Sequence, residues 1–330
     1  MTEPVSPALA PDPGTSVAKA GRFRSLPEVT ALLVFLIAEC IFFTVKSPYF
    51  LGWDNWLNIL TAIAVIGIVA APGTLLMTAG QFDLSVGSVT AFTSVILANL
   101  ALSHSLGFSV TVAVLAAIGV GVLNGFLVTV VGVNALITTL GTLAAFRGLS
   151  NVVADGQSVS VEGFSWLGND RPIFNIPIPV FLLILVMAAV WFLMRYTVYG
   201  RSMYAIGSNS AAARLVGVRT RTYIFIGFVL SAAACALSGL ILTSQLGVGS
   251  GLFGVGMELS VITAIVLGGA SLGGGRGSIV GTAVGLLIIG VLNNGLTLTG
   301  VDPFWQDVAR GTLLICAVSF DQLRRRLGGR

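Results

Sequence analysis

Charged side chains stand inside otherwise apolar stretches of this 330-residue chain, where they could bind or gate a polar solute. Asp83 and Glu258 each open an apolar stretch, and Arg147 and Arg310 lie deeper in theirs. A charge at membrane depth is costly, so each residue is a functional candidate by default. An acid at a helix N-terminus also stabilises the helix dipole, and an arginine can pack against carbonyl groups or an acid. Both interpretations of these four residues stay open.

Amide side chains add to these candidates. Asn124 and Asn293 lie near the middle of apolar stretches, and Ser85 follows Asp83 by two residues. Amides at such positions hydrogen-bond to neighbouring helices, which competes with solute contact as an explanation. We expect the following residues to line or gate a pathway: Asp83, Ser85, Asn124, Arg147, Glu258, Asn293 and Arg310.

A polar run at residues 195–221 carries five arginines and no acid. Basic loops resist translocation, so this run is predicted to be cytoplasmic. Within it, Asn209 or Ser210 can cap a short helix over residues 211–216, and Gly217 suits the left-handed residue after its end. A helix of two turns is not stable alone in water. It therefore needs a partner surface, either its own membrane domain or another protein.

The elements that must position these residues are membrane helices. Hydrophobic residues make up 55% of the chain, charged residues 9%, and the mean hydropathy is +0.98, whereas soluble domains carry about 25% charged residues. Most of the 17 basic residues fall on segments that one topology places on the same side, so the net charge of +4 indicates orientation and not nucleic-acid binding.

The hydropathy pattern predicts an all-α polytopic membrane protein with about ten transmembrane helices and both termini in the cytoplasm. Residues 1–27 are predicted to be a disordered cytoplasmic tail, 28–320 a transmembrane domain, and 321–330 a basic cytoplasmic tail, with 154–177 as an external loop. The predicted spans are 28–45, 57–79, 84–102, 108–131, 135–153, 178–194, 223–244, 257–272, 278–298 and 304–320.

The two halves of the chain repeat each other. Residues 83–86 (Asp-Leu-Ser-Val) recur as 258–261 (Glu-Leu-Ser-Val), and 121–124 recur unchanged as 290–293. Two shorter matches, at 132–133 with 300–301 and at 147–148 with 310–311, keep the same order. Since the predicted spans after Asp83 and Glu258 run in opposite directions, this is an inverted repeat, an architecture that many transporters share.

A glycine-rich stretch at residues 268–278 could suggest a phosphate loop, but it lacks the Gly-Lys-Ser/Thr ending. A tight re-entry turn is the better interpretation. The sequence contains neither a catalytic triad nor a cluster of metal ligands. We therefore expect no cofactor and no catalytic residue in this chain, and any ATP and Mg²⁺ would be bound by a partner ATPase.

Three motifs resemble the permease subunits of bacterial ABC importers of the ribose/xylose/galactoside type. They lie at residues 82–88, 139–149 and 204–218, and the match spans about residues 57–326. Glycine is usual where Gln81 stands, and the usual Gly-Asn-Pro-Glu reads Ser-Asn-Ser-Ala at 208–211. By resemblance, the third motif is the coupling helix that sits in a groove of the ATPase, with these residues: Gly207, Ser208, Asn209, Ala211, Ala212, Ala213, Arg214, Leu215 and Gly217.

The resemblance implies a multi-pass permease of the cell inner membrane that imports a monosaccharide or a related polyol. It also implies ATP-binding cassette ATPase subunits, a periplasmic or lipid-anchored sugar-binding protein, and a second permease copy, identical or paralogous. The alternative is a secondary transporter coupled to protons or sodium, which buried acids with a relay histidine would favour. The single His104 lies in a predicted loop, between Ser103 and Ser105. A membrane-embedded enzyme would need catalytic groups gathered at one depth.

Overall fold

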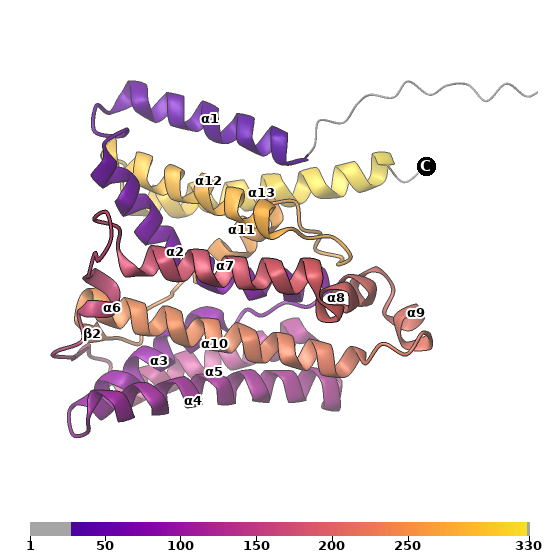
Figure 1. Ribbon diagram of the computed structural model, residues 1–330, viewed down its shortest axis with the longest axis horizontal. Helices are drawn as coiled ribbons and strands as arrows, with labels where there is room; N and C mark the ends of the chain where they lie inside the picture. The colour runs from indigo at the N-terminus through magenta and orange to yellow at the C-terminus, as the bar shows by residue number, and fades with distance from the viewer. Residues whose placement is uncertain (1–27, 329–330) are drawn as a thin grey trace, which may run out of the picture.

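The computed structural model describes residues 28–328 and consists almost wholly of helices (Figure 1). The predicted tail 1–27 and the last two residues of the predicted tail 321–330 lie outside the described residues. The helices are α1 (Glu28–Lys46), α2 (Trp53–Thr78), α3 (Val86–Ala101), α4 (Leu106–Phe126), the π-helical turn η1 (Leu127–Val131), α5 (Ala135–Val153), α6 (Trp166–Asn169), α7 (Ile178–Tyr196), α8 (Val198–Ser208), α9 (Ser210–Leu215), α10 (Thr220–Leu246), α11 (Met257–Leu267), α12 (Ile279–Leu298) and α13 (Pro303–Gly328). Two-residue strands, β1 (Val159–Ser160) and β2 (Val248–Gly249), pair antiparallel.

Six helical segments among the described residues are long and apolar enough to cross a membrane. They are α2, α4 with η1, α5, α7, α10 and α12. The predicted class, an all-α polytopic membrane protein, is confirmed. α2, α10 and α12 are the most buried of the six: within the most apolar 18 residues of each helix, 72%, 61% and 61% of the residues are buried. The core of the bundle therefore lies along these three helices.

Two predicted spans are shorter in the structure than in the sequence analysis. α3 has 16 residues and α11 has 11, and at 1.5 Å per residue neither covers a hydrocarbon core of about 30 Å alone. Non-helical segments, residues 79–85 and 250–256, precede them. Gly80, Gly254 and Gly256 have positive φ angles there. Left-handed glycines break the helical path, so α3 and α11 are half-helices.

The two halves of the bundle have the same element order, a long helix, a half-helix and two long helices: α2–α5 and α10–α13. Each leading helix packs on the other half, since α2 contacts α11 and α12 while α10 contacts α3 and α4. In Figure 1, α2 and α10 run in opposite directions through the bundle. The halves are therefore interlocked rather than placed side by side.

The polar run at 195–221 holds two helices where the sequence analysis predicted one. α8 is an amphipathic helix whose N-cap Thr197 accepts a hydrogen bond from the amide of Gly200 (3.3 Å). Met203 and Ile206 are buried on its inner face. The spacing of Tyr199, Met203 and Ile206 places all three on one side of a helix, a signal that arginines and glycines around it obscured.

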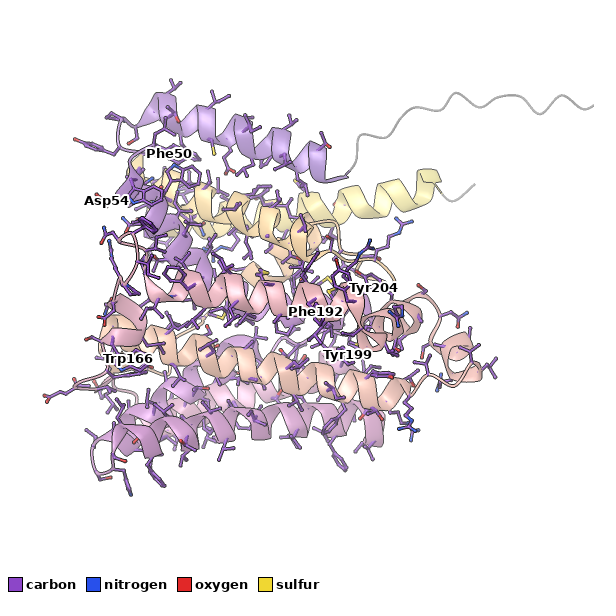
Figure 2. All side chains as sticks on the ribbon, viewed as in Figure 1. Phe50, Asp54, Trp166, Phe192, Tyr199 and Tyr204 are labelled. Atoms are coloured by element: carbon purple, nitrogen blue, oxygen red, sulfur yellow. The ribbon has the colours of Figure 1, made fainter. Side chains whose placement is uncertain are left out.

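Both ends of the described chain lie at the same end of the bundle as α8 and α9 (Figure 1). α13 continues as a helix to Gly328, past the predicted end of its span at residue 320. Figure 2 shows Phe50 and Trp166 at the opposite end from Tyr204. Aromatic side chains near both ends are typical of helices that meet the headgroup layers.

Candidate functional site

A polar network joins the start of α3 to two other helices. The Asp83 carboxylate accepts hydrogen bonds from the Ser85 amide (3.0 Å) and hydroxyl (2.6 Å), and from the Ser231 hydroxyl of α10 (2.7 Å). The Asn124 amide of α4 donates to the Ser85 hydroxyl (3.0 Å). These four residues, the Asp83 network, hold the segment between α2 and α3 against α4 and α10. Both oxygens of the Asp83 carboxylate accept hydrogen bonds, which favours a clamping role for Asp83 over a simple dipole effect.

Ser231 is the member of this network that the sequence analysis missed. A serine among the small residues of an apolar helix carries no local signal, because serines are common where transmembrane helices pack closely. The Ser231 hydroxyl reaches the Asp83 carboxylate only because α10 packs against α3.

The two half-helices meet start to start, at a contact that we call the α3–α11 junction. Gly87, the second residue of α3, lies directly against the Gly254 carbonyl and 2.8 Å, measured from an ideal Cβ, from the Glu258 Oε2 atom. No larger residue fits at Gly87 without a shift of backbone. Helix N-termini carry partial positive charge, so Glu258 lies where two of them converge.

Arg147 of α5 completes the junction. Its Nη1 atom donates hydrogen bonds to the carbonyl oxygens of Gly251 (2.7 Å) and Phe253. One arginine therefore fixes the non-helical segment 250–256, which leads into α11. Packing against carbonyls is the interpretation that this geometry supports.

Asn293 and Arg310 lie elsewhere. Asn293 is on α12 next to Asn294, whose amide exchanges hydrogen bonds with Asn55 of α2 (2.8 and 3.0 Å). Within the described residues, Arg310 pairs only with Asp307, one turn away on α13 (3.2 Å). Three of the seven predicted pathway residues, Asp83, Ser85 and Asn124, belong to the Asp83 network, and Arg147 and Glu258 lie at the α3–α11 junction. Asn293 and Arg310 belong to neither group, although the sequence repeat matches them with Asn124 and Arg147.

Both halves of the chain leave buried polar atoms without partners. Among the described residues these atoms are Glu39 Oε1 and Oε2, Asn124 Oδ1, Thr138 Oγ1, Glu258 Oε2, Asn293 Oδ1 and Arg310 Nε. Buried polar atoms of a native protein are nearly always paired. These groups are therefore candidates for a ligand, a partner chain or another conformation.

The short helix predicted in the polar run is present as α9. The Asn209 side chain caps it by accepting a hydrogen bond from the Ala212 amide (2.9 Å). At the other end Gly217 has a φ of +85°, and its amide and that of Val218 bond back to Arg214 and Ala213 (both 3.0 Å). This pair of bonds is the Schellman arrangement that a left-handed glycine permits. Both predicted helix signals, the cap and the glycine, are confirmed.

α9 projects beyond the end of the bundle (Figure 1) and turns apolar side chains outward. Leu215 is 89% exposed and Val216 80% exposed, while Ala213 is buried against the bundle. Ala212 is exposed as well. A membrane protein that places leucine and valine on a projecting polar segment presents a surface for another protein.

α8 ties this projecting helix to the membrane domain. The Tyr204 hydroxyl donates to the Gly277 carbonyl (2.7 Å), and the Tyr199 hydroxyl donates to the Tyr223 carbonyl (3.1 Å). Burial raises the pKa of both phenols, so they remain neutral donors. Gly207 lies against the end of α2, where the glycine-rich turn also hydrogen-bonds. α8 therefore connects α9 to α2, to α10 and to the glycine-rich turn.

Comparisons with known proteins agree with this architecture. Residues 55–318 match the family described as "Branched-chain amino acid transport system / permease component". The ribose import permease protein of Escherichia coli K12 is 35% identical over 91% of this chain and 95% of its own length, and that of Bacillus subtilis is 39% identical over 86% and 89%. The L-arabinose transport system permease protein of Escherichia coli K12 is 38% identical over 89% and 90%. No solved structure matches the chain.

The family match covers most of the chain, and the relatives align over nearly their whole lengths. The matched region holds the bundle, both half-helices and the projecting α9. The resemblance to ABC sugar permeases is confirmed: this chain belongs to the family of membrane permease components described as the branched-chain amino acid transport system / permease component, together with ribose and L-arabinose permeases.

Proposed function

We propose that this chain is the membrane permease subunit of an ATP-binding cassette importer for a monosaccharide, ribose-, xylose- or galactose-like, or a related polyol. The observation that carries the proposal is α9, a capped helix whose Leu215 and Val216 project from the end of the bundle. The ribose and L-arabinose permeases among its relatives support the substrate class. The protein resides in the cell inner membrane, as a multi-pass subunit.

The partners follow from this function. Two ATPase subunits in the cytoplasm bind ATP and Mg²⁺, and each receives an α9 as its coupling helix, with residues 207–217 at the contact. A periplasmic or lipid-anchored binding protein delivers the sugar to the other end of the bundle. A second permease copy, identical or paralogous, completes the pathway. In this chain Ala211 stands where the resemblance implies an acid in the coupling helix, so the contact with the ATPase depends more on shape and on Arg214.

Ten membrane segments, α1–α5, α7 and α10–α13, form this permease, with both termini and α9 in the cytoplasm. The opposite directions of α2 and α10 support an inverted repeat. Transporters with inverted repeats place their substrate sites at discontinuous helices between the repeats, so we assign pathway or gating roles to Asp83, Arg147 and Glu258 near the starts of the two half-helices. When the halves move relative to each other, the unpaired atoms of Glu258 and Asn293 gain new partners.

The topology predicts where a reporter will work. A reporter enzyme that is active only in the cytoplasm, fused after Ser208, should be active. The same reporter inserted after Gly163, in the connection between α5 and α7, should be inactive. The physical reason is that the basic residues of 195–221 resist translocation. The reverse pattern would contradict the whole arrangement of the spans.

The energy source separates the proposal from its alternative, an ion-coupled secondary transporter. In sealed vesicles that hold the permease, its ATPase and the binding protein, sugar uptake should require ATP. Uptake should persist when proton and sodium gradients are collapsed. Accumulation of sugar by the permease alone, without ATP but with an imposed ion gradient, would replace the importer with the secondary transporter.

A further inference from the structure

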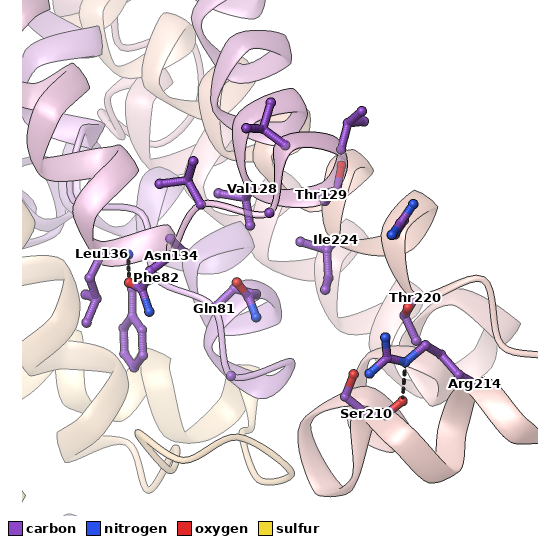
Figure 3. Close-up of a pocket in the computed structure, with 17 residues that line it drawn as sticks. Gln81, Phe82, Val128, Thr129, Asn134, Leu136, Ser210, Arg214, Thr220 and Ile224 are labelled. Atoms are coloured by element: carbon purple, nitrogen blue, oxygen red, sulfur yellow. Dashed lines mark hydrogen bonds between the residues drawn. The ribbon is translucent and has the colours of Figure 1, made fainter.

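A pocket of about 470 Å³ opens beside α9, and one of its sides is formed by the residues directly before Asp83 (Figure 3). Three connections border it: the segment between α2 and α3, the segment from η1 into α5, and α9 with the start of α10. It thus lies where the projecting helix meets two connections of the first repeat. The proposed transport function assigns no ligand to it.

The pocket is positively charged. Arg214 of α9 and Arg221 of α10 both line it, and none of the 17 lining residues, all from the described part of the chain, is an acid. The Arg214 Nε atom donates to the Ser210 carbonyl (3.3 Å) within α9. Neither arginine forms a salt bridge with an acid among the described residues. Two guanidinium groups therefore share a concave site without a counter-ion from the chain.

Neutral donors surround these cations. The amides of Gln81 and Asn134 and the hydroxyl of Thr220 line the pocket, and Figure 3 shows Gln81 and Asn134 on the side opposite Arg214. The pocket also holds the first residues of the long helices α5 and α10. The N-cap of α10, Arg219, makes no side-chain cap. Asn134 caps α5 by accepting from the Leu136 amide, so the uncapped positive end of α10 is the one that adds to the preference for an anion.

Apolar side chains form the remaining border. Val130 and Val131 of η1 are 58% and 57% exposed, and Leu136 of α5 is 41% exposed. In a membrane helix such side chains contact hydrocarbon. A ligand that fits must therefore pair an anionic head with apolar chains, which free phosphate does not.

We propose that this pocket binds the headgroup of an anionic phospholipid from the cytoplasmic leaflet. Arg214 and Arg221 bind the phosphate, and the acyl chains lie on Val130, Val131 and Leu136. Basic pockets between membrane helices on the cytoplasmic side suit such headgroups. The bound lipid would connect α9 to the start of α5, so that lipid composition adjusts how the coupling helix is held.

The test uses the purified full-length permease without its ATPase, so it is independent of sugar transport and ATP use. Native mass spectrometry should retain phosphatidylglycerol or cardiolipin in preference to phosphatidylcholine. The double variant R214Q/R221Q should weaken that retention about thirtyfold, since each basic residue near an anionic surface contributes about fivefold. Gln81→Glu, which keeps the shape of the side chain, should also weaken it by placing an acid in the pocket.

Arg219→Gln is the matched control, because Arg219 is exposed at the start of the same helix but does not line the pocket. It should weaken retention clearly less than a single change of Arg214 or Arg221, because Arg219 has no contact with a headgroup held in the pocket. Equal binding of charged and neutral lipids, or an unchanged R214Q/R221Q variant, would overturn the proposal. So would displacement of the lipid by millimolar inorganic phosphate, which would make the pocket a free-anion site. Loss of ATPase binding in R214Q/R221Q with no lipid retained by the original protein would make it a subunit contact instead.

Discussion

Ala212→Asp should abolish ATP-driven sugar uptake while the protein stays in the membrane at its normal amount. Ala212 is exposed on α9, beside the projecting Leu215 and Val216. In the free permease a carboxylate there is solvated and costs little. In the complex it would be buried against the ATPase without a partner, and an unpaired buried charge costs about 3–5 kcal/mol. Uptake should fall at least about a hundredfold, because each 1.4 kcal/mol corresponds to a factor of ten.

Ala211→Glu is the matched control, one residue away on the same helix. It restores the acid that the resemblance to sugar permeases implies at this position, and an acid in the first turn favours the helix dipole. Uptake and ATPase co-purification should remain near normal in Ala211→Glu and be lost in Ala212→Asp. Normal uptake in both variants would mean that α9 is not a docking helix. Loss in both would show that the contact excludes any acid, and that the family pattern does not transfer to this chain.

α9 was predictable because its signals are local. Asn209 before the helix and Gly217 after it act through the backbone within a few residues, so the sequence alone contains both. α8 follows the same rule, but its signal is weaker: the apolar spacing of Tyr199, Met203 and Ile206 is interrupted by Gly200, Arg201 and Ser202. Local patterns therefore account for most of the helices and for the projecting segment.

The candidate site at the start of α3 was predictable only in part. The acids and arginines could be named from their cost in a membrane, but their partners come from other helices. Ser231 reaches Asp83 from 148 residues away, and Arg147 reaches the Gly251 carbonyl across 104 residues. Periodicity within a helix cannot foresee such contacts. The predicted spans 84–102 and 257–272 are longer than α3 and α11 for a different reason: small and apolar residues continue past Leu267 into the glycine-rich turn, where the backbone is no longer helical.

Arg147→Met should lower the stability of the membrane domain more than the same change at its repeat counterpart, Arg310→Met. Methionine keeps the apolar stem but removes every donor. The Gly251 and Phe253 carbonyls then lose their partner, and Glu258 keeps its charge beside two helix ends without the guanidinium. A hydrogen bond from a charged donor contributes about 1.5–3 kcal/mol, and this variant loses two of them. In detergent the Tm should therefore fall by several degrees.

Arg310→Met serves as the control because Arg310 pairs only with Asp307 on its own helix, among the described residues. The Asp307 side chain is 70% exposed, and such a pair contributes about 0–1 kcal/mol. Adding Glu258→Gln to Arg147→Met should recover part of the lost Tm, since it removes the uncompensated charge but cannot restore the two hydrogen bonds to carbonyls. Equal Tm losses for the two arginine variants would mean that the α3–α11 junction does not depend on Arg147. No recovery by Glu258→Gln would assign the loss to the carbonyl bonds alone, and would remove Glu258 from the electrostatics of the junction.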